Sequence, residues 1–176
     1  MVFHPNIRES KVNYSWMLAA KDAGFCVKEM YGIYPNWKID VEREQQDLLD
    51  HDRIVLQFPF FWYSSPALLK LWLDTVLTYG FAFGPEDKIQ LRGKDLLLVV
   101  SVGGPYDSYV PGGYNNFSVT EFLRPFQQTA FLCRMNYITP FWMNGTSVAS
   151  QASVDEYAKK MVLHINTASR AYSFIS

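Results

Sequence analysis

Four residues at a predicted helix start, Ser10, Lys11, Val12 and Asn13, have the chemistry of an anion site. The first N–H groups of a helix lack intrahelical acceptors, and with the positive end of the helix dipole they attract a phosphate. The Ser10 hydroxyl and the Asn13 amide add side-chain donors. A serine before a helix is more often only a cap, so a plain helix start is the alternative. His4 precedes this turn and can either brace it or reach the phosphate.

A second candidate segment is the aromatic run Pro59-Phe60-Phe61-Trp62-Tyr63. It follows an apolar stretch at 54–58 that is predicted to be a buried strand, and ligands of α/β proteins lie beyond the carboxyl ends of such strands. The run offers backbone N–H groups beside flat apolar rings, which suits a planar aromatic cofactor with Trp62 against one edge. A small aromatic core beside the loop explains the same residues equally well.

A third segment, Ser101-Val102-Gly103-Gly104, ends the clearest apolar strand of the chain, predicted at 94–101. Paired glycines let the backbone approach a ligand closely, and their N–H groups can stabilise negative charge on it. The alternative is that Gly-Gly-Pro is simply a turn. Tyr109 follows soon after, where its phenol can donate to a substrate carbonyl; Tyr106 and Tyr114 are rival candidates.

The elements that must position these segments alternate along the chain. Strands are predicted at 1–3, 25–30, 54–58, 94–101 and 137–142, and helices at 12–23, from Asp40 onward, at 66–79 (capped by Ser64 or Ser65), at 118–134 and at 154–172. This rhythm predicts a five-stranded parallel sheet in the order 2-1-3-4-5, with helices on both faces and a ligand where strands one and three diverge. The first predicted strand, at 1–3, is short, because a central parallel strand normally has about 5–6 residues. We therefore expect that the chain starts late and lacks the beginning of this strand.

Composition limits the alternatives. The 176 residues, 49% of them hydrophobic, predict one domain over 1–176, and a net charge of −1 without a basic block argues against nucleic acid as a partner. No uncharged apolar run is long enough for a membrane span, and no signal peptide is apparent. Cys26 and Cys133 stand apart without a Cys/His cluster, which favours a reducing cytoplasm and predicts no metal site.

Motifs for other chemistries are absent from the sequence. It has no Gly-x-Gly-x-x-Gly, no Gly-x-x-x-x-Gly-Lys and no Gly-x-Ser-x-Gly, so neither dinucleotide fingerprint, P-loop nor nucleophile elbow is present. The carboxylates that follow Asp40 are expected to form a solvated helix face rather than an acid/base pair: Glu42, Glu44, Asp47, Asp50 and Asp52.

Taken together, these segments resemble the flavodoxin-like NAD(P)H:quinone oxidoreductases. The motifs are His4-Pro5 with Ser10-x-x-Asn13, then Phe58-Pro59-x-x-Trp62-Tyr63-Ser64-x-Pro66-x-x-Leu69-Lys70-x-Trp72-x-Asp74, and Gly103-Gly104 after a strand. Within that family the chain is similar to the small ancillary subunits of bacterial glutathione-regulated potassium-efflux systems, through Tyr34-Pro35-x-x-x-Ile39-Asp40, Gly80-Phe81-Ala82-x-Gly84 and Leu123-Arg124-Pro125-Phe126. The likeness spans His4 to about Pro140.

The resemblance implies a flavodoxin-like three-layer fold, bound FMN with FAD as the alternative, and two-electron hydride transfer from NAD(P)H to a quinone in ping-pong order. It also implies a homodimer with each active site at the subunit boundary, in the cytoplasm or peripheral on the inner face of the membrane. Carried over by motif, the flavin contacts are His4, Ser10 to Asn13, Phe60 to Tyr63 and Ser101 to Gly104, with Tyr109 as the substrate donor.

Two other functions stay open. One is a regulatory subunit that binds a potassium/proton antiporter, with redox activity secondary or absent; the other is a flavin-free interaction module. Two departures from the family pattern bear on flavin binding. Phe3 stands before His4-Pro5, where it is expected to crowd the phosphate turn, and Ser101-Val102 replaces a pair of threonines, which removes one hydroxyl.

Overall fold

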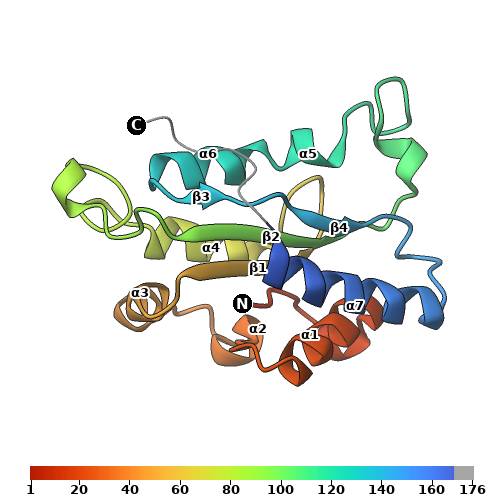
Figure 1. Ribbon diagram of the computed structural model, residues 1–176, viewed down its shortest axis with the longest axis horizontal. Coiled ribbons are helices and arrows are strands. Elements are labelled where there is room, and N and C mark those ends of the chain that lie inside the picture. The colour runs from red at the N-terminus through yellow and green to blue at the C-terminus, as the bar shows by residue number, and fades with distance from the viewer. Residues whose placement is uncertain (169–176) are drawn as a thin grey trace.

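A parallel sheet forms the centre of the protein, described here by a computed structural model over residues 1–168. Within those residues it has four strands: β1 (Arg53–Pro59), β2 (Asp95–Ser101), β3 (Asn136–Tyr137) and β4 (Phe141–Met143). β1 pairs with β2 from Arg53–Asp95 to Pro59–Ser101, and β3 and β4 both pair with the other side of β2 (Figure 1). Because all pairings are parallel, the carboxyl ends of β1, β2 and β4 meet at one edge.

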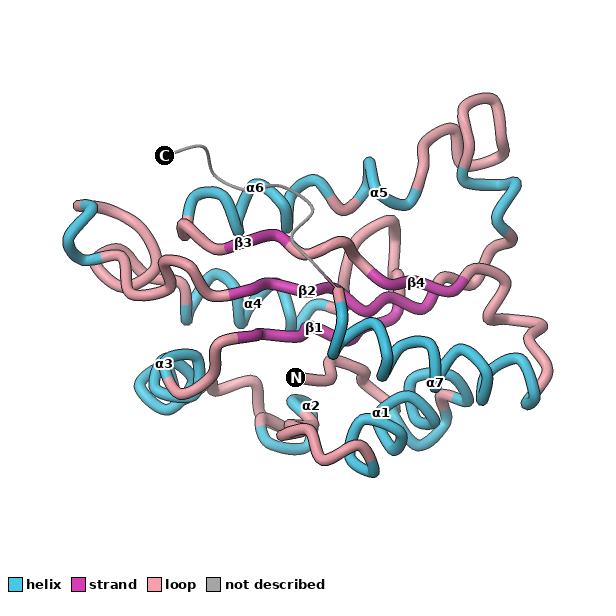
Figure 2. The backbone as a smooth tube through the Cα atoms, in the orientation of Figure 1, coloured by secondary structure: helices cyan, strands magenta, loops and turns pink. Residues whose placement is uncertain are grey.

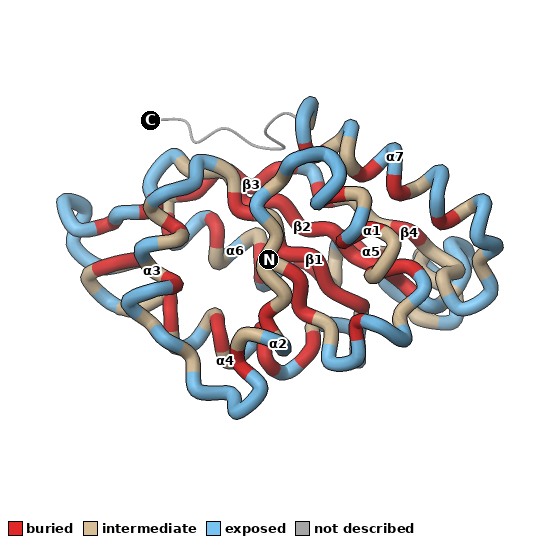
Figure 3. Tube along the Cα trace, turned by 90° about the horizontal axis from the view of Figure 1, so that it is seen from below, coloured by how far each residue is buried: buried red, intermediate tan, exposed pale blue. Residues whose placement is uncertain are grey.

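Helices cover both faces of this sheet (Figure 2). One face packs against α4 (Ala67–Val76), α5 (Val119–Phe122) and α6 (Arg124–Leu132), and the other against α1 (Lys11–Asp22) and α7 (Gln151–Thr167). β2 is buried on both sides since Leu96 and Leu98 enter the first core while Leu97 and Val99 enter the second. Figure 3 shows buried residues along the strands and exposed residues on the outer sides of the helices. The result is a three-layer α/β architecture.

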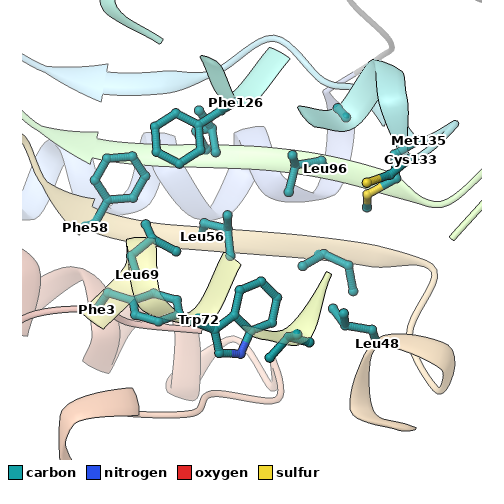
Figure 4. Close-up of a cluster of buried hydrophobic side chains, with 14 of the residues drawn as sticks. Phe3, Leu48, Leu56, Phe58, Leu69, Trp72, Leu96, Phe126, Cys133 and Met135 are labelled. Atoms are coloured by element: carbon teal, nitrogen blue, oxygen red, sulfur yellow. The ribbon is translucent and has the colours of Figure 1, made fainter. Parts of the chain in front are cut away.

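The first core contains the ring pairs that hold the sheet to its helices (Figure 4). Phe58 stacks on Phe126 with ring centroids 5.3 Å apart, and Phe3 meets Trp72 edge to face at 6.0 Å. Phe3 is fully buried there. The expectation that Phe3 crowds the turn after it is therefore wrong, because its side chain packs into the core.

The strands predicted at 1–3 and 25–30 are isolated bridges instead. Val2 bridges in parallel to Glu29 on one side and to Gln57 on the other. The pairing extends no further because the chain turns at His4-Pro5, and a one-turn helix, α2 (Met30–Ile33), begins at the end of the other segment. The described residues form four strands where five were predicted, so the predicted count is wrong and the full order 2-1-3-4-5 is not confirmed.

Two other predicted elements are each split in two by a proline. The strand predicted at 137–142 becomes β3 and β4, because Pro140 between them has no N–H for the ladder. The helix predicted at 118–134 becomes α5 and α6 with a break at Leu123, since Pro125 cannot donate to the preceding turn. α7 starts earlier than predicted because Ser150 caps it; the predicted end at 172 lies outside the described residues.

The remaining helices follow their predictions closely. α1 starts one residue before its predicted start, and α3 (Val41–Leu49) is capped by Asp40, which accepts from the Arg43 backbone N–H. α4 begins after Pro66 without a side-chain cap, so the cap predicted from Ser64 or Ser65 is wrong. Three short 3-10 turns complete the elements: η1 (Ile7–Glu9), η2 (Glu86–Lys88) and η3 (Tyr106–Tyr109). Throughout 1–168, each helix is too short or too polar to traverse a bilayer.

The carboxylate helix α3 differs from expectation at one residue. Glu44 is fully buried, where it pairs with Lys28 and accepts hydrogen bonds from Tyr34 Oη at 2.7 Å and Trp72 Nε1 at 2.9 Å. A charge taken out of water must be paired and hydrogen-bonded in this way. The prediction of a wholly solvated carboxylate face is wrong for Glu44, which ties α3 to α4.

Candidate functional site

A cavity of about 260 Å³ opens at the edge where the carboxyl ends of the strands meet. Its walls come from the turn before α1, from the loops after β1 and β2, and from the loop after β4. The lining residues are His4, Ser10, Lys11, Val12, Asn13, Pro59, Phe60, Phe61, Ser101, Gly103, Thr146 and Ser147. The three segments singled out in the sequence thus converge on one cavity, joined by a fourth that the sequence reading missed.

The start of α1 forms the positively polarised end of this cavity. Ser10 is the N-cap residue, and its Oγ accepts from the Asn13 backbone N–H at 3.2 Å. The N–H groups of Lys11 and Val12 precede any intrahelical acceptor and are left for a ligand. The Lys11 ammonium donates to the Ala149 carbonyl at 2.6 Å, which ties the fourth loop to this helix start.

The Asn13 amide, predicted to donate to a ligand, is committed to the protein. Its Nδ2 donates to Ser101 Oγ at 2.8 Å and to Ser10 Oγ at 3.2 Å. Gln57, which the sequence reading missed, donates from Nε2 to the Asn13 backbone carbonyl at 2.8 Å. A polar residue inside the apolar strand at 54–58 was the signal for it. This buried network fixes α1, β1 and β2 to one another beneath the cavity.

His4 braces the turn, which was one of its two predicted roles. Its Nδ1 accepts from the Asn6 backbone N–H at 3.1 Å, and its ring lies edge to face with Phe61 at 6.2 Å. Burial lowers the pKa of His4, opposed in part by the charge of Glu9. His4 also lines the cavity, so a neutral imidazole stands beside the anion end.

The aromatic run divides between the cavity and the surface. Pro59, Phe60 and Phe61 line the cavity, whereas Trp62 and Tyr63 do not. Trp62 is 93% exposed, and Tyr63 stacks on Phe122 at 5.0 Å. Trp62 and Tyr63 both adopt positive φ, at 48° and 61°. The tip of the loop therefore presents its rings to solvent and to α5 rather than to the cavity.

The third segment also divides. Ser101 and Gly103 line the cavity, while Val102 is fully buried and Gly104 accepts from the Gly145 backbone N–H at 2.7 Å. The Tyr109 ring covers Gly104: a Cβ at residue 104 would lie 3.1 Å from Tyr109 Cε2. A side chain at 104 would require the Tyr109 ring to shift by a few tenths of an ångström.

Tyr109 lies next to the cavity rather than in its wall. Its ring packs edge to face on Phe60 at 5.9 Å and on Phe122 at 6.3 Å. Burial raises the pKa of Tyr109, so its phenol remains a donor at neutral pH. The rivals Tyr106 and Tyr114 are both exposed.

The fourth loop, between β4 and α7, brings Thr146 and Ser147 into the cavity wall. Thr146 N–H donates to the Val102 carbonyl at 3.0 Å. A Cβ at Gly103 would lie 2.9 Å from Ser147 Oγ, so with any other residue at 103 the Ser147 side chain or its loop would have to shift. Hydroxyl residues directly after the last strand were the signal for this loop, since every parallel strand ends at the same edge.

A larger cavity, of about 410 Å³, lies near the amino end of β1 and contains none of the predicted site residues. Its walls are mostly apolar, and its cations Lys28 and Arg53 are paired with Asp47 and Asp95. The hydroxyls, glycines and free helix N–H groups instead gather at the smaller cavity, which is the candidate site.

Known proteins are similar to this chain in sequence and in fold. The chain is 47% identical to the uncharacterized NAD(P)H oxidoreductase YrkL of Bacillus subtilis over 163 residues, 92% of this chain and 93% of that protein. It is 41% identical to the glutathione-regulated potassium-efflux system ancillary protein KefG of Cronobacter sakazakii over 154 residues, 85% of this chain and 83% of that one.

Two solved structures are similar along nearly the whole chain. General stress protein 14 of Treponema denticola, solved in complex with FMN, has a TM-score of 0.89 and 41% identity, covering 94% of this chain and 95% of that one. An NADPH-quinone reductase of P. pentosaceus has a TM-score of 0.79 and 30% identity, covering 93% and 94%. Residues 1–165 match the family described as having a flavodoxin-like fold, and the chain belongs to that family.

Proposed function

We propose that the protein is an FMN-dependent oxidoreductase that passes a hydride from NAD(P)H to a quinone. The observation that carries the proposal is the convergence of a helix N-terminus, an aromatic wall and a glycine turn on one cavity. The similarity to a protein solved with FMN and to one named NADPH-quinone reductase supports it. So does the similarity to YrkL, named an NAD(P)H oxidoreductase.

The residues of the cavity fit a flavin mononucleotide. Ser10, Lys11 and the free N–H groups of α1 would hold the phosphate. Phe60 and Phe61 offer flat apolar surface to the ring system, and Gly103 presents backbone without a side chain in the cavity wall. Bound FMN supplies the hydride chemistry that the chain's own side chains lack. The protein's share is to bind, to orient and to exclude water.

Substrate binding is assigned to the surface beside Gly104. The Tyr109 phenol stays protonated at neutral pH and can donate to a carbonyl oxygen of a quinone. The segments at 62–63 and 106–117 carry several exposed aromatic side chains: Trp62, Tyr63, Tyr106, Tyr114 and Phe117. An exposed aromatic surface of this kind suits a second subunit, and we propose a homodimer whose boundary completes the substrate site.

The sheet order 2-1-3-4-5 remains part of this proposal. The parallel bridges of Val2 to Glu29 and Gln57 support a position for residues 1–3 between the segment at 28–30 and β1. In that order His4 and Pro59 end neighbouring segments, which is where a doubly wound sheet holds its ligand.

The purified protein tests this function directly. A yellow protein whose released chromophore has the absorbance and mass of FMN, and which oxidises NADH or NADPH only after a quinone is added, agrees with the proposal. A colourless protein that rejects added FMN contradicts it and favours a flavin-free interaction module.

A second function has one specific observation in its favour, the 41% identity to KefG, a potassium-efflux ancillary protein. In this alternative the protein docks from the cytoplasm on a potassium/proton antiporter, and its redox activity is secondary. Pull-down with the cytoplasmic domain of such an antiporter tests it, and flavin-loaded and flavin-free protein should be compared. If the flavin-loaded and flavin-free proteins bind the antiporter domain equally well, the regulatory role does not depend on the enzymatic one.

A further inference from the structure

Two hydroxyls of the candidate site are held by one buried amide. Asn13 is only 2% exposed, and its Nδ2 donates to Ser101 Oγ at 2.8 Å and to Ser10 Oγ at 3.2 Å. Ser10 Oγ accepts a second hydrogen bond, from the Asn13 backbone N–H. Both serines line the cavity, so a single buried residue of the same wall controls two groups that face a ligand.

Gln57 fixes which way this amide points. Gln57 Nε2 donates to the Asn13 backbone carbonyl at 2.8 Å, a group that can only accept, and the same nitrogen lies 3.4 Å from Asn13 Oδ1. A flipped Asn13 side chain would bring its NH2 group against the NH2 group of Gln57. Two donors repel, so the Asn13 nitrogen must face the serines.

The direction of the serine protons follows from this orientation. A hydroxyl has one proton and two acceptor lone pairs. Ser10 and Ser101 both accept from Asn13, and within residues 1–168 neither hydroxyl donates to a protein acceptor. Each proton is therefore left for a partner in the cavity, and that partner must offer hydrogen-bond acceptor atoms.

We propose that Asn13 and Gln57 are positioning residues that make Ser10 and Ser101 a pair of obligate hydrogen-bond donors to the bound ligand. The inference rests on the proposed function and specifies its ligand chemistry. Ser10, beside the start of α1 and Lys11, meets a phosphate oxygen, and Ser101 meets another oxygen of the same molecule. A ligand that offers only donors would leave both hydroxyls unsatisfied.

Flavin binding tests this with two ligands. Dissociation constants of FMN and of riboflavin, which lacks the phosphate, are measured by quenching of flavin fluorescence. Asn13→Ala should weaken FMN binding about 10-fold, the cost of losing oriented donors at a buried site. Ser10→Ala should weaken FMN more than riboflavin, whereas Ser101→Ala should weaken both.

The double variant separates positioning from plain destabilisation. If Asn13 acts through Ser101, Asn13→Ala combined with Ser101→Ala costs less than the two single changes together. Asn136→Ala is the matched control. Asn136 is 5% exposed and donates to Gly93 and Asp95 at the other end of β2. Its loss removes a buried amide far from the cavity and should leave the FMN affinity unchanged.

Three outcomes overturn the inference. The first two are wild-type FMN affinity in Asn13→Ala and strict additivity in the double variant. If Asn13→Ala does not fold, Asn13→Asp replaces it. The aspartate carboxylate has the shape of the asparagine amide but can only accept hydrogen bonds, so both serine hydroxyls should donate to it and not to the ligand. The affinity even for uncharged riboflavin should then fall, and an unchanged riboflavin affinity is the third outcome. A wild-type protein that binds no FMN overturns the proposed function instead, and this inference with it.

Discussion

Trp72 Nε1 donates a hydrogen bond of 2.9 Å to Glu44 Oε2, and both side chains are almost completely buried. The same carboxylate pairs with Lys28 and accepts from Tyr34. It raises the pKa of Tyr34 further, although burial is the larger cause. One buried charge thus connects α3, α4 and the segment around α2 at the margin of the core, where Figure 4 shows Trp72 beside Phe3.

Removing this carboxylate should be costly. Glu44→Ala leaves the Tyr34 hydroxyl and the Trp72 N–H without an acceptor and leaves Lys28 paired with Asp47 alone. Each buried donor left unsatisfied costs about 1–3 kcal/mol. The free energy of unfolding in urea measures the loss. Exposed Glu42 on the same helix is the control, since Glu42→Ala should change stability by no more than about 0.5 kcal/mol. Equal losses in the two variants would show that Glu44 is not a specific cross-link.

The elements that the sequence predicts best are those with an unambiguous apolar period. β1, β2 and α1 lie within a residue or two of their predicted bounds, and α3 starts where predicted, after Asp40. The failures come from tertiary context. Proline at 125 and 140 divides predicted elements, and the apolar segments at 1–3 and 25–30 make single bridges where a longer ladder was expected. Glu44 has the residue type of a solvated face, and only the fold reveals its three partners.

The candidate site follows the same division. Parallel topology brings the carboxyl ends of the strands to one edge of the sheet. The sequence therefore sufficed to predict that Ser10, Phe60 and Gly103 lie near one another. It could not show that Asn13 turns its amide away from a ligand, because that depends on Gln57 and Ser101. Nor could it choose between a ligand wall and a surface tip for neighbouring rings such as Phe61 and Trp62.

Gly103 should be intolerant of a side chain. A Cβ there would lie 2.9 Å from Ser147 Oγ, and relieving such a clash costs about 1–3 kcal/mol. Gly103→Ala should therefore weaken FMN binding as the fourth loop shifts, measured by fluorescence titration. Adding Ser147→Ala removes the clashing oxygen and should recover most of the affinity. Gly32→Ala, whose Cβ would make only an ordinary contact with Glu29 at 3.5 Å, should leave it unchanged.

If Gly103→Ala alone binds FMN normally, the Ser147 side chain yields to the new methyl group without moving the loop. If the double variant fails to recover while both variants remain folded, the glycine matters for a reason other than Ser147. In either case the fourth loop would lose its role in shaping the cavity.

Stability should depend on pH through His4. Burial lowers the pKa of folded His4 below its usual value of about 6.5. Between the folded and unfolded pKa values the unfolded chain binds more protons, so the free energy of unfolding falls as the pH drops through about 6.5. Protonation also removes the Nδ1 acceptor from the Asn6 N–H.

His4→Asn checks this dependence because an asparagine oxygen can accept from the same N–H without titrating. Urea unfolding from pH 8 to pH 5 should show a flatter decline below about pH 6.5 in the variant than in the wild type. Above pH 7 the two curves should run in parallel, which is the internal control. Identical slopes throughout would mean that His4 does not contribute to the acid side of the stability curve.

Trp62 combines strain with exposure, which predicts a functional rather than a stabilising side chain. Its φ of 48° is a conformation that costs a non-glycine residue about 1–2 kcal/mol, yet its indole is 93% exposed. Trp62→Gly relieves the strain, offset by about 0.5–1 kcal/mol of extra freedom in the unfolded chain. We expect unchanged or slightly higher stability in urea, and for Trp62→Ala a change within about 0.5 kcal/mol.

The Trp62 variants should change substrate binding or self-association even though they leave the free energy of unfolding unchanged. If the indole contacts a second subunit or the substrate, both variants raise the KM for quinone or weaken self-association, measured by steady-state kinetics and by sedimentation. Exposed Phe131, on α6, provides the matched control as Phe131→Ala, which should leave both measurements unchanged. Loss of about 2 kcal/mol or more in both Trp62 variants, with kinetics and association intact, would instead make the indole a structural group.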